Sequence, residues 1–220
     1  MEKAIRLLIR SDHVPSAPGE TFVSAPWLRA LPAGNPDLLS LLPVADLNAA
    51  ALRHLDPPVR GSDRGGVFTA LAMVDPFLRP RDAVARLRRA GISGVANFPT
   101  MQIVDGETAR AFEGAGARTT REVEMLEAFV AEGLRTIAFA CGADGARDVA
   151  RTRPTMMVLH PGVALSDWRQ RAAGALAVQR LIEPCRAEAG CPVLVYRPEG
   201  FGSELDQAIA EADGEARIAG

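Results

Sequence analysis

Cysteine is scarce in this 220-residue sequence, and long apolar runs are absent from it. The three cysteines, Cys141, Cys185 and Cys191, have no metal-ligand spacing, and their odd number gives no complete disulfide framework. No stretch approaches the ~20 apolar residues of a membrane span. The short apolar run at residues 5–9 lacks the hydrophobic region of a secretory signal. We therefore expect a reducing, cytoplasmic location and no membrane association.

The sequence also lacks a strong excess of charge. It carries 25 Lys and Arg against 27 Asp and Glu, for a formal net charge of −2, and its pI is about 6.0. This balance gives no electrostatic reason to expect nucleic acid or anionic lipid as a partner. Hydrophobic residues make up 48% of the chain, which is ample for a core. We expect one domain over residues 1–220, somewhat shorter than the usual α/β barrel of about 250 residues.

Three apolar runs share one pattern at their ends. Each run finishes in a polar residue and then in Pro or Phe-Pro, and the polar residues are Asp75, Asn97 and His160. Continuous apolar runs are typical of strands buried on both faces of a parallel sheet. Because parallel strands share one carboxyl edge, the pattern predicts a site at that edge.

Helical and strand signals alternate along the chain. The predicted strands cover residues 5–9, 20–24, 67–74, 94–98, 135–140, 155–159, 192–196 and 216–219. The predicted helices cover residues 46–55, 80–90, 119–132, 143–151, 166–189 and 203–212. Eight strands alternating with helices predict an α/β fold, a (β/α)8 TIM-like barrel.

The predicted barrel is irregular or incomplete at both ends. The first crossover has no room for a helix between residues 9 and 20, and no helix follows the last strand. An unclosed first or last strand would leave an exposed edge. We therefore expect a homo-oligomer or a heteromeric partner that covers this edge.

Asp75 and His160 are the strongest catalytic candidates because of their position at strand ends. Asp75 could bind a divalent metal or act as a general base, or it could instead cap a helix or turn. His160 could be an acid/base group, a metal ligand or an anion donor, or a buried histidine bonded to backbone. Since the candidates carry oxygen ligands, Mg²⁺ is the expected ion. No nucleotide or organic cofactor is indicated.

Asn97 and Thr100 could donate hydrogen bonds to an oxyanion or carboxylate, or could serve turn chemistry. Glu122 and Glu124 lie too close in a predicted helix to share one face. Glu122 fits a capping box with Thr119, so Glu124 is favoured as the group that reaches the barrel mouth. Asn48 belongs to the predicted start of a helix capped by Asp46 and is a second candidate for the rim.

Weaker signals come from a thiol and from glycine. Cys141 follows a strand but has no basic neighbour in sequence, so an inert buried thiol is favoured over a nucleophile. Glycine-rich passages at residues 60–66 and 199–203 match neither a P-loop nor a dinucleotide fingerprint. The second passage precedes a helix and could form a generic anion site.

Several motifs together resemble those of the phosphoenolpyruvate hydrolase-like family of TIM barrels, which also supplies the C-terminal domain of a plant antiviral resistance protein. The order and most of the spacing agree from about residue 22 to about residue 189. The matching segments are Leu41-Leu42-Pro43-Val44-Ala45-Asp46-Leu47-Asn48, Val74-Asp75-Pro76-Phe77, Gly94-Val95-Ala96-Asn97-Phe98-Pro99-Thr100, Ile103-Val104-Asp105-Gly106, Arg121-Glu122-Val123-Glu124-Met125 and Leu159-His160-Pro161-Gly162.

The resemblance implies an enzyme that acts on a small oxoacid or on a phosphorylated or carboxylated substrate. C–C or C–P bond cleavage, or hydrolysis, with metal assistance is the implied chemistry. In that scheme Asp75 takes the metal or base role, His160 the acid/base role, and Asn97 and Thr100 bind the oxyanion or carboxylate. The chain departs from the family pattern at both ends and at several rim positions, such as residues 196–200. The alternative is therefore a catalytically degenerate barrel that acts as a binding, regulatory or assembly subunit.

Overall fold

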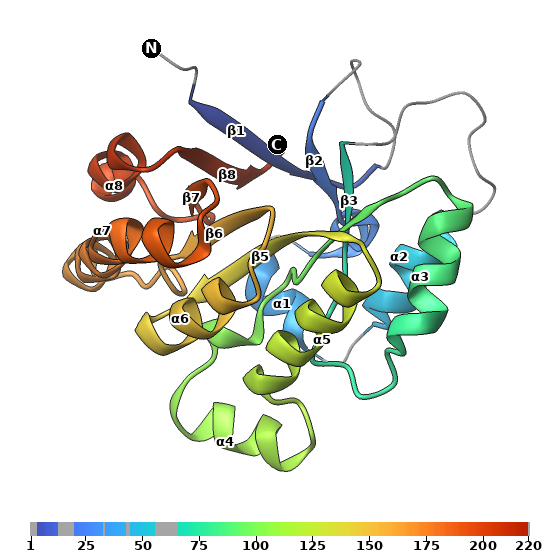
Figure 1. The fold of residues 1–220 in the computed structure, drawn as a ribbon. Helices are drawn as coiled ribbons and strands as arrows, with labels where there is room; N and C mark the ends of the chain where they lie inside the picture. Colours follow the sequence, from blue (N-terminus) through green and yellow to red (C-terminus); the bar gives the residue numbers. More distant parts are fainter. Residues whose placement is uncertain (1–3, 13–19, 33, 43–44, 56–65, 220) are drawn as a thin grey trace.

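The chain closes into a barrel of eight parallel strands, shown in Figure 1. The computed structural model describes residues 4–12, 20–32, 34–42, 45–55 and 66–219. Each strand pairs with the next along the chain, and the last pairs with the first. The strands are β1 (Ile5–Arg10), β2 (Phe22–Ser24), β3 (Val67–Ala70), β4 (Gly94–Ala96), β5 (Arg135–Cys141), β6 (Met156–His160), β7 (Val193–Tyr196) and β8 (Gly214–Ile218). The predicted (β/α)8 fold class is confirmed.

Helices follow most of the strands. The α-helices are α1 (Pro36–Leu41), α2 (Leu47–Arg53), α3 (Pro80–Arg89), α4 (Gly106–Gly114), α5 (Thr119–Ala131), α6 (Ala143–Arg151), α7 (Trp168–Ala189) and α8 (Asp206–Glu211). Three 3₁₀ turns, η1 (Pro26–Ala30), η2 (Met101–Ile103) and η3 (Ser203–Leu205), complete the described elements. None of the described helices is long and apolar enough to cross a membrane.

The first and last strands form a continuous ladder, from Ile5 opposite Gly214 to Ile9 opposite Ile218. The expectation of an open barrel edge is therefore wrong. The last strand begins at Gly214, two residues before its predicted start. The prediction missed these two residues because Gly214 and Glu215 carry no apolar signal. A Cβ at residue 214 would lie 1.9 Å from the carbonyl oxygen of Ile5, so glycine is required where the two strands meet.

The predicted irregularity at both ends stays a prediction. Most of the β1–β2 connection, residues 13–19, and nearly all of the glycine-rich passage at residues 60–66 lie outside the described residues. The barrel is complete in its eight strands.

Some elements differ from their predicted extent. The predicted strand at residues 67–74 leaves the sheet after Ala70, although Leu71, Met73 and Val74 stay buried. The prediction ran too far because burial alone does not distinguish a strand from a packed turn. The helices α1 and α4 were not predicted. The start of α1 carries a recognisable signal, since Asn35 caps the helix by accepting a hydrogen bond from the Leu38 amide and Pro36 follows it.

Aromatic rings fill the barrel near the carboxyl ends of the strands. Phe98 and Phe139 lie 5.2 Å apart between ring centroids, and Tyr196 lies 6.1 and 5.9 Å from them. The His160 ring is 4.9 Å from the Tyr196 ring. All four rings are buried. This packing places β4, β5, β6 and β7 side chains in one contiguous cluster under the barrel mouth.

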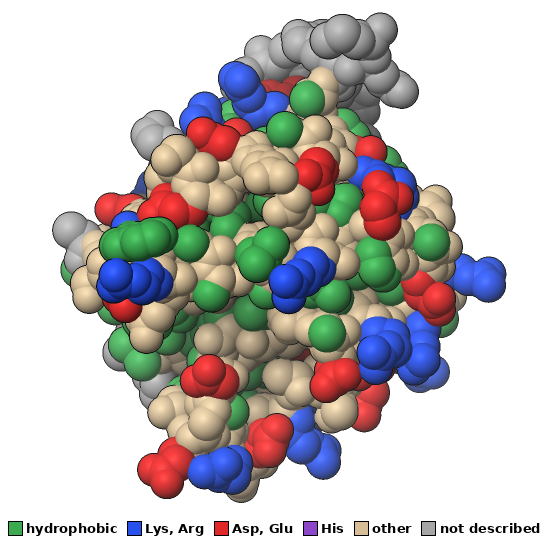
Figure 2. Space-filling model, turned by 90° about the vertical axis from the view of Figure 1, so that its left-hand side faces the viewer, with side chains coloured by type: hydrophobic (Ala, Val, Ile, Leu, Met, Phe, Trp, Pro, Cys, Tyr) green, Lys and Arg blue, Asp and Glu red, His purple; other side chains and the backbone are tan. Residues whose placement is uncertain are grey.

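The surface on the side of α6, α7 and α8 has no area of a single charge. Figure 2 shows acidic and basic side chains interspersed there with apolar ones. Three of the six ion pairs described on these helices join residues three apart, such as Asp144 with Arg147. Such pairs contribute little to stability and mark a solvated face.

Candidate functional site

Three polar networks lie where the strands end. We call them the Asp75 pair (Asp75 with Asn48), the Glu122 network (Glu122 with Thr100, Met101 and Gln102) and the Asp37 network (Asp37 with Tyr196 and His160). Together with Asn97 they contain all the predicted site residues except Glu124. Each network is built by side chains from two or more separate segments of the chain.

The Asp75 pair joins two predicted residues. The Asn48 amide donates to Asp75 Oδ2 at 2.8 Å and also bonds both the N–H and the C=O of Ala72, at 2.9 and 3.0 Å. Asn48 reaches the loop because it lies in the first turn of α2, which Asp46 caps through the Ala49 amide, as predicted. Asp75 Oδ1 accepts from the Phe77 amide at 2.8 Å. These contacts support the turn alternative for Asp75.

A pocket of about 370 Å³ adjoins the Asp75 pair. Its described walls combine Asp46, Asn48 and Asp75 with apolar side chains such as Leu47 and Phe77. No group of three or more His, Cys, Asp or Glu side chains comes together among the described residues. Since Asp75 already accepts two hydrogen bonds and Asn48 is fully bonded, these residues do not assemble a magnesium site by themselves. Mg²⁺ binding stays a prediction.

Asn97 is bonded entirely within the barrel. Its amide accepts from the Phe139 N–H at 2.7 Å and donates to the Phe139 C=O at 2.9 Å. The side chain is fully buried, and it continues the pairing of β4 with β5 beyond the last backbone pair. Asn97 therefore has a structural role at the strand end. Its side-chain amide is occupied by the Phe139 backbone and is not free to bind a substrate.

Thr100 and Glu122 hold each other in the buried Glu122 network. The Thr100 hydroxyl donates to Glu122 Oε2 at 2.7 Å, and the Met101 amide donates to Oε1 at 2.7 Å. The predicted capping box is therefore wrong, because Glu122 turns inward to bond η2 and α5 has no side-chain cap. Burial raises the pKa of Glu122 to about 7, although the hydrogen bonds it accepts oppose that rise.

Glu124 lies exposed on α5, two residues from the buried Glu122. The described contacts do not bring it to any of the three networks. Its catalytic role therefore gains no support from the geometry and stays a prediction. The carboxylate that α5 directs toward the strand ends is Glu122, which the sequence pattern had explained as a cap.

The Asp37 network contains the predicted His160 and two residues that sequence reasoning missed. The Tyr196 hydroxyl donates to Asp37 Oδ1 at 2.8 Å, and His160 Nε2 lies 3.4 Å from Asp37 Oδ2. The Asp37 and His160 side chains are each only 2% exposed. Burial and the adjacent Asp37 carboxylate raise the pKa of Tyr196 well above its usual value, so Tyr196 stays a hydroxyl donor at neutral pH.

The contacts of His160 fix its tautomer. The Gly162 amide donates to Nδ1 at 3.0 Å, so the proton of a neutral imidazole lies on Nε2. The Tyr196 hydroxyl thus donates to the Asp37 carboxylate, whereas His160 Nε2 lies 3.4 Å from it without a hydrogen bond. The two donors come from the ends of adjacent strands, β6 and β7.

Signals for the two missed residues exist in the sequence. Tyr196 ends an apolar run just as His160 does, and it is the only tyrosine of the chain. Asp37 follows the Asn35-Pro36 helix-start pair. Neither pattern reveals that α1 carries Asp37 to the ends of β6 and β7.

A second pocket, of about 460 Å³, lies beside the Asp37 network at the ends of β7 and β8. Pro36, Tyr196, Arg197 and Arg217 are among its lining residues. Arg197 is held by Glu215 at 2.5 Å, by Asp206 at 2.8 Å and by the backbone of Gly202. These bonds fix the segment after β7, so the wall of this pocket is preformed.

Other features carry less chemistry. Burial, aided by the charge of Asp105, raises the pKa of Cys141 to about 11, which agrees with an unreactive thiol.

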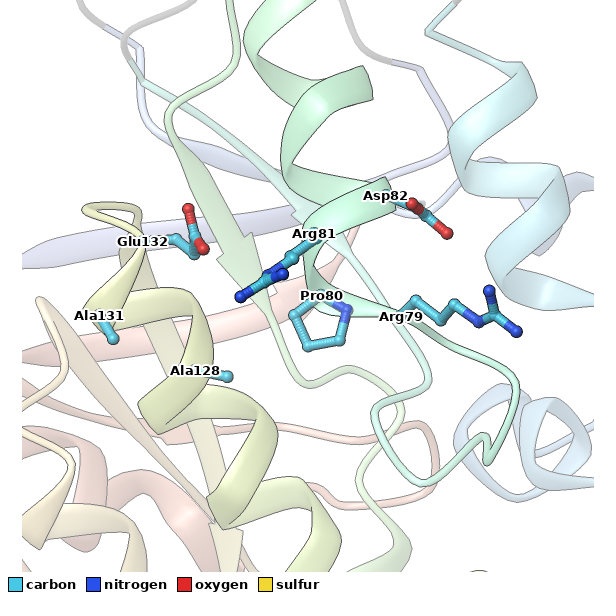
Figure 3. Close-up of a pocket in the computed structure, with 7 residues that line it drawn as sticks. All are labelled: Arg79, Pro80, Arg81, Asp82, Ala128, Ala131 and Glu132. Carbon is cyan, nitrogen blue, oxygen red and sulfur yellow. The ribbon is translucent and has the colours of Figure 1, made fainter.

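A surface pocket of about 560 Å³ between α3 and α5 contains none of the predicted site residues. In Figure 3, Arg81 extends across it toward α5, whereas Arg79 points to the other side of α3.

The networks are connected by packing. Asn97 bonds the backbone of Phe139, whose ring packs on Tyr196, and this contact joins the strand-end residues of β4, β5 and β7. Arg121, next to Glu122, donates to the backbone carbonyl of Asp75 at 3.2 Å. Among the described residues, no side-chain hydrogen bond links one network directly to another.

Residues 28–187 match the family described as phosphoenolpyruvate hydrolase-like. The match covers the Asp75 pair, the Glu122 network, Asp37 and His160, and it spans more than half of the chain. The chain belongs to the phosphoenolpyruvate hydrolase-like family. The resemblance in the sequence motifs is therefore confirmed, and the family match ends before β7 and Tyr196.

Curated relatives agree with this membership. The chain is 33% identical over 134 residues to the ToMV resistance protein Tm-1(GCR237) of Solanum lycopersicum, a match that covers 61% of this chain and 18% of that protein. It is 32% identical over 127 residues to the uncharacterized protein y4oT of Sinorhizobium fredii, covering 58% of this chain and 62% of that protein. The chain therefore spans a small part of the tomato protein and under two thirds of y4oT.

Proposed function

We propose that this phosphoenolpyruvate hydrolase-like protein is an enzyme that acts on a small oxoacid, phosphorylated or carboxylated, by bond cleavage or hydrolysis. One observation carries the proposal: at the ends of two adjacent strands, the Tyr196 hydroxyl donates to the Asp37 carboxylate and His160 Nε2 lies 3.4 Å from the same carboxylate. The family membership supports the substrate class, and the carboxyl ends of the strands are where barrel enzymes hold their sites.

Two converging donors suit one kind of chemistry. When a C–C or C–P bond at the carbon adjacent to the carbonyl of an oxoacid breaks, the electron pair of that bond passes onto the carbonyl oxygen as an enolate, and in hydrolysis water captures the departing fragment. Fixed donors in a site shielded from water stabilise such an oxyanion strongly. Tyr196 and His160 would hold that oxygen as hydrogen-bond donors. Arg217, in the adjacent pocket, supplies a positive charge for a second anionic group.

The experiment is an NMR assay with a panel of phosphorylated, phosphonylated and carboxylated oxoacids. The wild-type protein is expected to cleave at least one of them, and Tyr196→Phe and His160→Gln to lower the rate by about 10²-fold or more. His54→Gln, at the end of α2, is the matched control for replacing a histidine. Cleavage that proceeds equally in all variants would exclude Tyr196 and His160 from the reaction.

A second function, as a non-catalytic binding or assembly subunit, is favoured by a different observation. Asn97, Thr100 and Glu122 are buried and spend their polar groups on internal bonds. A barrel that kept only these structural bonds would bind partners without turnover. Since the barrel is closed, an oligomer would have to use a surface other than an open strand edge. Failure of the wild-type protein to cleave any member of the panel would favour this second function.

A further inference from the structure

We propose that Tyr196 and His160 form a binding subsite for the carboxylate of a small ligand, and that Asp37 occupies this subsite as a displaceable internal ligand. The proposal rests on the proposed function for the ligand class, small oxoacids and dicarboxylates. It assigns to Asp37 the position that a ligand carboxylate would take.

The first argument is the geometry around Asp37. One carboxylate oxygen accepts from Tyr196 at 2.8 Å, whereas the other lies 3.4 Å from His160 Nε2. Asp37 Oδ2 and His160 Nε2 are both buried and have no hydrogen-bond partner. Buried groups without a partner are costly. A free carboxylate that can approach both donors at hydrogen-bond distance therefore makes a better ligand than Asp37, which the backbone of α1 holds in place.

The second argument is the weak attachment of α1. A helix of six residues is unstable without tertiary contacts. On this helix only Asp37 and Ser40 are buried, and Leu38 and Leu42, in and just after it, are 38% and 41% exposed. Ser40, also on α1, has a buried hydroxyl without a partner. The Asp37 side chain is thus the main polar attachment of α1, and its displacement would free the whole helix.

The third argument is the space beside the subsite. The pocket of about 460 Å³ is lined by Pro36, the residue before Asp37, and by Tyr196. A ligand whose carboxylate replaces Asp37 could place its remaining atoms in this pocket, where Arg197 and Arg217 provide positive charge. Because Arg197 is already bonded to Glu215 and Asp206, Arg217 is the arginine we assign to a second anionic group.

The test is binding of oxalate and pyruvate, measured by calorimetry, to the wild-type protein and to Asp37→Ala. Removal of the internal ligand raises the fraction of binding-competent protein, so Asp37→Ala should bind oxalate about tenfold or more tightly. Adding Tyr196→Phe to Asp37→Ala should abolish the gain. Asp82→Asn, an exposed acidic residue in the first turn of α3, and pyruvamide, which lacks the carboxylate, are the controls and should show no gain. Equal or weaker oxalate binding by Asp37→Ala would overturn the proposal.

A second measurement covers the case in which Asp37→Ala does not fold. Amide hydrogen exchange of the wild-type protein at saturating oxalate should show faster exchange in residues 38–41, because the ligand releases α1. Slower or unchanged exchange there would overturn the proposal. Tighter binding by Asp37→Ala without cleavage of any oxoacid would sustain this proposal and reject the proposed enzyme. Wild-type cleavage combined with weaker binding by Asp37→Ala would sustain the proposed enzyme and reject this proposal.

Discussion

The Tyr196 hydroxyl and the Asp37 carboxylate are 159 residues apart in the chain and 2.8 Å apart in the structure. Tyr196 ends β7, and Asp37 belongs to a helix of six residues that follows the second strand. His160 lies beside both. The bond therefore ties a short peripheral segment to the part of the barrel where the strands end and chemistry is expected.

Glu122 should make the stability of the protein depend on pH. Its pKa rises from 4.5 to about 7 on folding, so the charged form is disfavoured in the folded state. The stabilisation by protonated Glu122 is complete below pH 4.5 and is lost as the pH rises to about 7. The free energy of unfolding should fall by roughly 3 kcal/mol over this range. Urea unfolding between pH 4.5 and 8 should show this fall in the wild-type protein.

Glu122→Gln should remove that dependence on pH. The glutamine carbonyl can accept from the Met101 amide, and its NH₂ group can donate to the Thr100 oxygen. Glu124→Gln, on the exposed face of the same helix, is the control and should keep the wild-type profile. Identical profiles for the wild-type protein and Glu122→Gln would show that Glu122 does not titrate in this range.

Asn97→Ala should destabilise the barrel severely. The substitution leaves the N–H and C=O of Phe139 buried without partners, at about 1 to 3 kcal/mol each. The free energy of unfolding should therefore fall by about 2 to 6 kcal/mol, measured by urea titration. Gln170→Ala, on the exposed face of α7, should change it by less than about 0.5 kcal/mol. A small effect of Asn97→Ala would mean that its amide is available for a ligand.

Gly214→Ala should disturb barrel closure. A Cβ there would lie 1.9 Å from the Ile5 carbonyl oxygen, and backbone must shift to accept it, at about 1 to 3 kcal/mol. Amide exchange should quicken in β1 and β8 in particular. Gly114→Ala, at the end of α4, meets no atom within 4 Å and serves as the control. Unchanged exchange in β1 and β8 would contradict the observed ladder between them.

Magnesium should have little effect on the protein alone. Asp75 already accepts from Asn48 and Phe77, and one carboxylate holds Mg²⁺ weakly unless a substrate adds oxygen ligands. Thermal unfolding should therefore show no shift in Tm with Mg²⁺ alone. With oxalate present, a rise in Tm that disappears in Asp75→Asn would support the metal role predicted for Asp75. A rise with Mg²⁺ alone would mean that the geometry around Asp75 understates its capacity as a ligand.

The alternation of strand and helix signals sufficed to predict the barrel, because apolar runs and helix boundaries are local properties. Closure was not predictable in the same way. It depends on Gly214 meeting Ile5, a contact between the two ends of the chain, and Gly-Glu is not a strand signal. The short helix α1 was missed because six residues give too little periodicity, although Asn35-Pro36 marks its start.

The site was predictable in position and only partly in detail. Asn97 and His160 do lie at strand ends, as the repeated pattern indicated, whereas Asp75 lies in the loop five residues after β3 ends at Ala70. Their partners come from elsewhere in the chain, so no local pattern shows that the Asn97 side chain bonds the Phe139 backbone. The direction of a helix face is also set by tertiary packing, and therefore Glu122 turned inward to meet η2 while Glu124 stayed exposed.

The measurement that tests the central claim most directly is exchange of the pyruvate methyl protons with D₂O, followed by proton NMR. If Tyr196 and His160 stabilise an enolate, the wild-type protein should speed this exchange above the buffer rate. Tyr196→Phe and His160→Gln should then bring the exchange close to the buffer rate. Exchange at the buffer rate with wild-type protein that demonstrably binds pyruvate would contradict the proposed chemistry.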